Sequence, residues 1–280
     1  MVYFIYNPMS NANTSIEIKD KTINDIKEKF NEFEEIDGTK IDIVKFCKEL
    51  KDDDILIISG GDGTVNLFAN IFKDNNIKNE IYLAGNAGTG NDFLNDIGPD
   101  QKMVQLNKYF ENLPKVYANG QEKYFINNVG FGIDGMVCIV AEDQKKKGKK
   151  KINYTSITIG LLLGKYKRRN ATVKVDGKEI YYKNVWLVSS MNGRYYGGGM
   201  NSAPSQDRFS DKVSLVVMHG GLRIPTLIRF TKIFKGTHIK YKKYVEIIEG
   251  KNIEVTFDKS CGLQYDGEII DNVTTYKVEK

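Results

Sequence analysis

The chain has 280 residues, of which 41% are hydrophobic and 28% charged, a composition typical of a folded globular protein and not of a disordered one. The formal net charge of +5 leaves room for a nucleotide, a nucleic acid or a membrane surface as an anionic partner, but it indicates none of them alone. The three cysteines, Cys47, Cys138 and Cys261, lack metal-ligand spacing and are odd in number. They favour reduced thiols in a cytoplasmic protein over a disulfide framework.

The first 110 residues predict strands that alternate with helices. Apolar runs predict strands at 2–6, 41–46, 55–58 and 81–84, and helical spacing or position predicts helices at about 16–33, 65–72 and 91–97. This alternation favours a parallel sheet covered on both sides. The N-terminus reads as a strand and not as a signal peptide.

The pattern changes after about residue 110. Strands are predicted at 124–128, 171–175, 179–189, 213–218, 244–248, 253–257 and 274–278, with only two helical segments, near 152–166 and 222–235. Such a series is typical of a mainly antiparallel β-sandwich. We therefore expect an α/β domain at 1–110 and a β-sandwich domain at 111–280, with the active site in a cleft between them. The last strand is a candidate to return to the first domain.

A glycine-rich string, residues 60–66 (GGDGTVN), joins a buried strand to a helix. Glycines let the backbone turn tightly and bring its N–H groups close to an anion, and the helix N-terminus adds its positive end. The carboxylate of Asp62 would repel a phosphate unless Mg²⁺ lies between them. A strand-to-helix turn without a ligand is the alternative, but the full string favours a phosphate site.

This string resembles the diacylglycerol kinase catalytic-domain family, which includes bacterial soluble lipid kinases and sphingosine kinases. Shorter forms occur in NAD kinases and phosphofructokinases, so the string alone does not settle the substrate. Further segments are similar to the family's motifs and stand in the same order: Asn7-Pro8, 88–93 (GTGNDF), 127–135 (NNVGFGIDG), 196–204 (YGGGMNSAP) and 264–268 (QYDGE). The resemblance spans almost the whole chain and implies a first domain like that of NAD kinases and phosphofructokinases.

The resemblance implies a role for each matching residue. The nucleotide-contacting positions are Asn7, Gly60, Gly61, Asp62, Gly63, Thr64, Asn66 and Thr89. Asp62 and Asp92 match acidic positions near Mg²⁺, and Asp92 is counted with the cofactor-binding set. Glu268 matches the proton acceptor, so Glu268 and Asp62 are the catalytic candidates. Without the resemblance, residues 266–268 would read as a solvated hairpin turn.

Two positions depart from the family's pattern. Asn86 stands where the family often has proline, which affects only the turn. The family's Asp-Gly pair, which helps to hold a structural Mg²⁺, is replaced by Ser210-Asp211. Asp211 is the nearest metal-ligand candidate, and Asp207 is the other.

Two segments are candidates for contact with a membrane. The lysine run 145–151 precedes the apolar stretch 157–163, which is too short to cross a bilayer. Ile224, Leu227, Ile228 and Phe234 share one helical face among basic residues. Such a lysine run is usually a solvated loop, and such a face more often packs in the core; the functional alternatives are contact with an anionic bilayer surface for the first segment and a lipid entry wall for the second. The basic runs show no nucleic-acid-binding pattern, and a homodimer is left open.

The sequence thus predicts an ATP- and Mg²⁺-dependent kinase of a lipid alcohol, with diacylglycerol giving phosphatidic acid as the first candidate. The expected place is the cytoplasm, peripheral to the inner face of the membrane. The alternatives are a kinase of another lipid or of a soluble alcohol such as NAD, and a non-catalytic lipid- or nucleotide-binding homologue.

Overall fold

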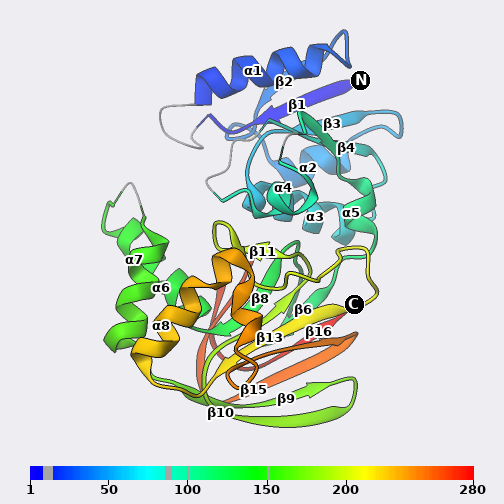
Figure 1. Ribbon diagram of the computed structural model, residues 1–280. Helices are drawn as coiled ribbons and strands as arrows, with labels where there is room; N and C mark the ends of the chain where they lie inside the picture. Colours follow the sequence, from blue (N-terminus) through cyan, green and yellow to red (C-terminus); the bar gives the residue numbers. More distant parts are fainter. Residues whose placement is uncertain (9–14, 86–89, 100, 150–151) are drawn as a thin grey trace. The chain divides into compact units, whose positions relative to one another are not determined.

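The computed structural model describes residues 1–8, 15–85, 90–99, 101–149 and 152–280 (Figure 1). The chain divides into two compact units, Met1–Leu113 and Pro114–Lys280, where the sequence predicted a boundary at residue 110. In the described helices, none is long and apolar enough to cross a membrane.

The first unit is built on a five-stranded sheet with the order β2-β1-β3-β4-β5. The pairs β1–β2, β1–β3 and β3–β4 are parallel, and only β5 runs antiparallel to its neighbour β4. The elements are β1 (Val2–Tyr6), α1 (Ser15–Lys27), β2 (Glu34–Asp37), α2 (Ile43–Lys48), β3 (Ile55–Ile58), α3 (Asp62–Asp74), β4 (Glu80–Ala84), α4 (Asp92–Ile97), β5 (Met103–Gln105) and α5 (Asn107–Glu111).

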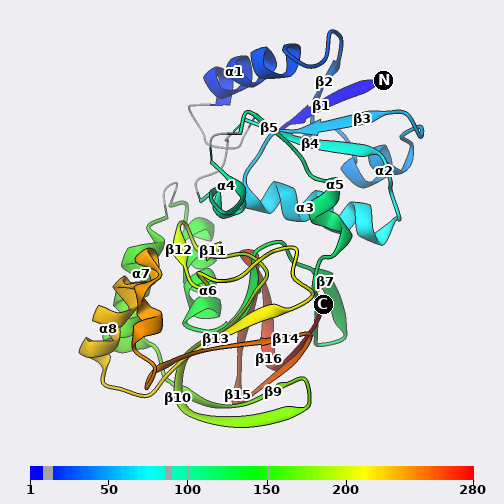
Figure 2. The ribbon, with the colours of Figure 1, turned by 45° about the vertical axis from the view of Figure 1, so that its right-hand side comes forward.

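Helices cover both faces of this sheet, as the unbroken apolar strands require. Phe4, Ile57 and Tyr82 pack against Ile26 of α1 on one face. Leu56, Ile58 and Leu83 point to the opposite face because successive strand residues alternate, and α3 lies on that side in both views (Figures 1 and 2). The predicted α/β domain is therefore confirmed.

One predicted strand of this unit is wrong. Residues 41–46 are not extended, because Ile43–Lys48 forms helix α2. Asp42 begins this helix by accepting the backbone N–H of Lys45 at 3.0 Å, as N-cap residues do. The second strand is instead β2, a half-exposed strand at the sheet edge, where an apolar run is not required. Helix α3 also begins at Asp62, three residues before the predicted start.

The second unit is an antiparallel β-rich domain. Its main sheet has nine strands in the order β14-β13-β10-β8-β15-β16-β6-β7, and β9 pairs with both β10 and β15. The strands are β6 (Lys115–Ala118), β7 (Gln121–Tyr124), β8 (Asn128–Gly132), β9 (Arg169–Val175), β10 (Lys178–Met191), β11 (Tyr195–Tyr196), β12 (Met200–Asn201), β13 (Val213–His219), β14 (Val245–Gly250), β15 (Asn252–Tyr265) and β16 (Glu268–Glu279). The helical segments are α6 (Ile133–Lys146), α7 (Tyr154–Gly160), the π-helix η1 (Leu161–Lys165), α8 (Arg223–Thr231) and the 3₁₀ turns η2 (Ile233–Lys235) and η3 (Thr237–Lys240).

Strands β10 and β15, of 14 residues each, connect the two layers of this domain. The C-terminal part of each strand pairs with β8, through only Gln264 and Tyr265 in β15, and the N-terminal part pairs with β9. Register shifts interrupt β10 between Tyr182 and Leu187 and β15 between Thr256 and Leu263. Such irregularities let a strand pass from one layer to the other, which gives the predicted sandwich.

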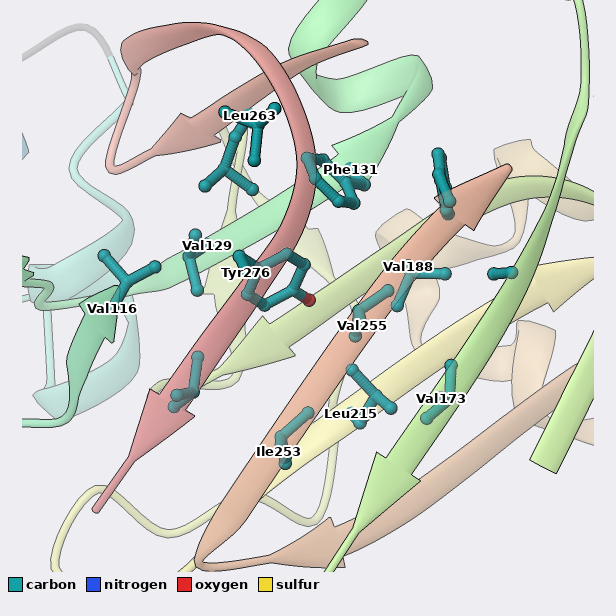
Figure 3. Close-up of a cluster of buried hydrophobic side chains, with 14 of the residues drawn as sticks. Val116, Val129, Phe131, Val173, Val188, Leu215, Ile253, Val255, Leu263 and Tyr276 are labelled. Carbon is teal, nitrogen blue, oxygen red and sulfur yellow. The ribbon is translucent and has the colours of Figure 1, made fainter. Parts of the chain in front are cut away.

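The core of the sandwich is filled by side chains from strands far apart in the sequence (Figure 3). Phe131 of β8 lies edge-on to Tyr276 of β16 with 4.9 Å between ring centroids, and 4.8 Å from Phe257 of β15. Val255 and Leu215 are fully buried beside them. The aromatic contacts therefore fix the middle strands of the domain to one another.

Three expectations about this unit need correction. Helix α6 was not predicted, and the range 124–128 spans the end of β7 and the start of β8 instead of forming one strand. The last strand, β16, pairs with β15 and β6 of its own unit and does not return to the first.

Gly135 of α6 makes a testable contribution to this packing, because a Cβ there would overlap the carbonyl of Gly262 in β15. Gly135→Ala should lower the free energy of unfolding by about 1–3 kcal/mol, as measured by chemical denaturation. Gly160→Ala in α7 is the matched control, since a Cβ there meets no described atom within 4 Å. That variant should be unchanged or more stable by up to about 1 kcal/mol; equal losses in both would contradict the packing of α6 on β15.

Candidate functional site

The first group of predicted site residues lies at one edge of the parallel sheet. Asn7 follows β1, Gly60 follows β3, and Gly85 follows β4. These three strands are neighbours, so their carboxyl ends meet at the same edge, where ligands of open α/β sheets bind. Asn7 is exposed there.

The turn from β3 to α3 is closed by backbone contacts. Gly61 is the N-cap residue and provides no side-chain cap, and its carbonyl accepts the N–H groups of Thr64 and Val65 at 2.9 and 3.1 Å. A Cβ on Gly63 would meet no described atom within 4 Å, whereas one on Gly60 would overlap the Thr64 side chain. The glycines therefore serve two purposes: Gly60 admits Thr64 to the turn, and Gly63 keeps the helix end accessible to an anion.

Asp62 connects this turn to the next motif. Its carboxylate accepts the backbone N–H of Phe93 at 2.7 Å and that of Asp92 at 3.0 Å. These are the first N–H groups of α4, whose own N-cap residue, Asn91, makes no side-chain cap. Asp62 thus caps a helix 30 residues away in the sequence and brings residues 60–66 and 91–93 together.

The remaining predicted residues of this unit lie around that contact. Asn66 is buried in α3, and its side-chain oxygen accepts from Asn70 at 3.0 Å. Asp92 is buried at the start of α4. Thr89, with the rest of residues 86–89, lies outside the described residues.

This edge has the donor chemistry for Mg²⁺. Asp62 and Asp92 offer carboxylate oxygens, and Asn7 offers an amide oxygen; Mg²⁺ prefers such ligands and usually keeps several waters besides one or two carboxylates and phosphate. Over the described part of the chain, no group of three or more Asp, Glu, His or Cys side chains is placed to hold a metal ion. The donor set therefore fits a Mg²⁺ that binds together with a phosphate ligand.

The second group of predicted residues lies in the hairpin between β15 and β16. Asp266 and Gly267 form its two-residue turn with φ values of 45° and 93°. The Asp266 carboxylate accepts backbone N–H groups from Ile126, Asn127 and Asn128. Asp266 is therefore a structural anchor for the segment that leads into β8, not a solvated turn residue.

Glu268 is the first residue of β16 and stands opposite Tyr265. Its side chain is exposed. Burial, followed by the nearby charge of Glu268, raises the pKa of the Tyr265 hydroxyl. The hairpin thus gives Glu268 a fixed backbone position and an accessible carboxylate, as a base acting on a bound alcohol needs.

Sequence reasoning missed a buried polar network beneath this hairpin. Arg208 donates to the backbone carbonyl of Ile126 at 2.7 Å and to the Asn127 side chain at 2.6 Å. Asn192 donates to the same carbonyl, and Lys280 donates to Asn192. In the sequence, only the motif at 127–135 pointed to this network, because it contains Asn127.

The metal candidate Asp211 is exposed and forms an ion pair with Lys251 at 2.5 Å. The hydrogen bond from Lys251 lowers the pKa of the Asp211 carboxyl. Asp207 accepts the backbone N–H of Phe209 at 3.0 Å. A metal at Asp211 stays a prediction, and binding there would have to displace Lys251.

Two family models divide the chain close to its structural boundary. A model described as the diacylglycerol kinase catalytic domain matches residues 1–119. A model described as the YegS C-terminal NAD kinase beta sandwich-like domain matches residues 127–278, more than half of the chain. The chain belongs to the diacylglycerol kinase catalytic-domain family. The resemblance carried by the motifs is thereby confirmed.

Relatives and solved structures agree with this family. A putative lipid kinase of Staphylococcus aureus strain bovine RF122 is 27% identical over 247 residues, which cover 81% of this chain and 77% of that protein. A second, from strain MRSA252, matches to the same extent. Crystal structures titled as a putative diacylglycerol kinase and as a diacylglycerol kinase, both of Bacillus anthracis strain Sterne, give TM-scores of 0.72 and 0.68. At 20% and 21% identity, covering 99% of this chain and 93% of theirs, they confirm the fold.

This family member also contains a buried carboxyl that the sequence did not single out. Asp134, at the start of α6, accepts from the Tyr196 hydroxyl at 2.9 Å through Oδ1, while its Oδ2 has no hydrogen-bond partner in the described structure. Burial raises the pKa of Asp134 to about 8, against the smaller lowering effect of the hydrogen bond from Tyr196. The carboxyl is therefore expected to be mainly neutral at pH 7.

This raised pKa predicts a pH dependence of stability. Between about pH 4 and pH 8 the unfolded Asp134 ionises while the folded one keeps its proton, so its contribution to the unfolding free energy falls by up to about 1.4 kcal/mol per pH unit. Asp134→Asn should remove that slope, as measured by denaturation across this range. Tyr196→Phe is the control that keeps the carboxyl. An unchanged slope in Asp134→Asn would contradict a neutral buried carboxyl.

Proposed function

We propose that the chain is an ATP- and Mg²⁺-dependent lipid kinase that transfers the γ-phosphoryl group to a lipid hydroxyl, with diacylglycerol giving phosphatidic acid as the first candidate. The observation that carries the proposal is the contact of Asp62 with the N–H groups of Asp92 and Phe93. It joins the two glycine-containing motifs of the family at the N-terminus of α3.

The proposed chemistry assigns one task to each group. The N–H groups at the start of α3 bind phosphate oxygens. Asp62 and Asp92 would hold a Mg²⁺, which when bound would neutralise phosphate charge. The acceptor hydroxyl oxygen forms a bond to the γ-phosphorus, the bond to the β–γ bridging oxygen breaks, and ADP leaves. Glu268 takes the hydroxyl proton. Most of the acceleration comes from positioning and charge neutralisation.

The lipid substrate is supported by the relatives. The S. aureus proteins are named lipid kinases and the B. anthracis structures diacylglycerol kinases. The hydroxyl of diacylglycerol is a neutral alcohol, which suits a carboxylate base such as Glu268. In this proposal the enzyme acts from the cytoplasm, where its three free cysteines stay reduced.

The test is transfer of radiolabel from ATP to a panel of extracted lipids. The wild-type chain should label one lipid class in the presence of Mg²⁺, and chelation of the metal should stop labelling. Glu268→Gln should reduce kcat by about 100-fold or more while leaving the unfolding free energy unchanged, because the side chain is exposed. Glu279→Gln, an exposed glutamate at the far end of the same strand, is the matched control.

Each contrary result has a defined meaning. Labelling of NAD or another soluble alcohol without lipid would replace the substrate. Nucleotide binding with no turnover on any lipid would make the chain a non-catalytic homologue. Full activity of Glu268→Gln would remove that residue as the base and leave the kinase proposal standing.

A further inference from the structure

Large apolar side chains are exposed on one helical region of the second unit. Among the described residues, nine of the fourteen exposed large hydrophobic side chains lie in residues 154–163 and 222–241. The most exposed are Leu222 at 76%, Ile224 at 68%, Ile228 at 55% and Leu163 at 52%. Isolated exposed apolar residues need no explanation, but such a concentration marks an interaction surface.

Helix α8 shows that this exposure belongs to one face. Phe230 and Leu227 point inward to the core shared with Trp186. Ile224 and Ile228, four residues apart and thus on the same side of the helix, point outward. The predicted apolar face is therefore divided, and core packing accounts only for its inner part.

The two segments are held together as one surface. Arg223 of α8 donates to the backbone carbonyls of Leu162 and Tyr166 at 3.0 and 3.1 Å. Arg168 donates to the carbonyl of Gly221 at 2.8 Å. Helices α7 and α8 accordingly lie side by side in both views (Figures 1 and 2). We call the exposed apolar residues Tyr154, Ile159, Leu163, Leu222, Ile224, Ile228 and Phe234 the α7–α8 surface.

The sequence around this surface is strongly basic. Residues 144–175 and 212–245 contain 19 of the 41 Lys and Arg residues and none of the 36 Asp and Glu residues. These stretches carry a formal charge of +19, and the rest of the chain carries −14. The side chains of Lys167, Lys232, Lys235, Lys242 and Lys243 are exposed. The net charge of the chain is small, but its positive charge is concentrated in these two stretches.

We propose that the α7–α8 surface docks onto an anionic lipid bilayer, with Ile224 and Ile228 inserted at the boundary between headgroups and acyl chains and the surrounding lysines on the lipid phosphates. Exposed apolar side chains flanked by cations are the pattern of a helix that lies in a membrane interface. The inference deepens the proposed function, because a lipid kinase that does not span the membrane must reach its substrate there.

Two other occupants fit the surface less well. A second copy of the chain would bring the same basic segments against each other in a twofold interface, and like charges repel. Nucleic acid is held mainly through phosphate contacts from basic side chains, and those leave the exposed leucines and isoleucines without a role. A bilayer with anionic lipids uses both the charge and the apolar area.

The experiment is co-sedimentation of the full chain, without nucleotide, with vesicles of equal parts phosphatidylcholine and phosphatidylglycerol. The wild-type chain should bind these vesicles and bind pure phosphatidylcholine much less. The double variant Ile224→Ser with Ile228→Ser should lower the partition coefficient about tenfold, and so should Lys232→Gln with Lys235→Gln. Unchanged thermal unfolding midpoints would show that all variants are folded.

Matched controls alter other exposed residues, outside the α7–α8 surface. Val44→Ser with Tyr181→Ser changes apolar residues that are 41% and 58% exposed, and Lys178→Gln with Lys183→Gln changes exposed lysines of β10. Both should bind vesicles like the wild type. Equal binding by the surface variants and the controls would overturn the inference, as would absent wild-type binding.

The outcomes separate docking from catalysis and from self-association. Vesicle binding without lipid phosphorylation would keep the docking and reject the proposed function. Phosphorylation of a detergent-dispersed lipid without vesicle binding would keep the proposed function and reject the docking. A wild-type dimer that becomes monomeric in Ile224→Ser with Ile228→Ser, with no vesicle binding, would assign the surface to a second copy of the chain.

Discussion

The candidate phosphate site depends on one carboxylate that caps a helix from a distance. Asp62 belongs to the turn before α3, yet it accepts the first N–H groups of α4. Its carboxylate accepts the backbone N–H groups of Asp92 and Phe93, so this contact holds the start of the second motif against the first. The same contact directs the Asp62 carboxylate from the start of α3 toward α4. One interaction therefore organises both loops.

The second unit also contains a carboxylate that accepts backbone N–H groups of a segment distant in the sequence. The Asp266 carboxylate holds the N–H groups of residues 126–128, and Arg208 holds the other side of that segment. Glu268, two residues further on, has an exposed side chain. Of the two acids in this short motif, Asp266 therefore has a structural role, whereas Glu268 is the one assigned to chemistry in the proposed function.

The sequence predicted elements wherever local pattern decides the structure. The strands at 55–58 and 213–218 were predicted correctly, because every position in them, or nearly every position, is apolar. Helix α6 was missed because Gly132 and Gly135 interrupt its start, and Gly135 is required by close contact with Gly262 rather than by any turn. Residues 41–46 alternate like a strand, but the Asp42 cap makes the following residues helical.

The site could be listed from sequence, but its contacts could not. Motifs named Asp62 and Asp92 without showing that one carboxylate binds the backbone of the other residue. Arg208 belongs to no motif, and its role arises only because the fold brings it to Ile126 and Asn127. Likewise, helical spacing placed Leu227 and Ile228 on one face, whereas burial separates them, because the edge of an apolar face is set by what packs against it.

Amide hydrogen exchange at Asp92 and Phe93, compared between the wild type and Asp62→Asn, tests the central claim most directly. The Asp62 carboxylate accepts both of these N–H groups, so its replacement should lower their protection. The account predicts that both are protected in the wild type and exchange about tenfold or more faster in Asp62→Asn, with affinity for Mg²⁺-ATP falling in parallel. Equal exchange rates in the two proteins, or unchanged nucleotide affinity once protection is lost, would contradict it.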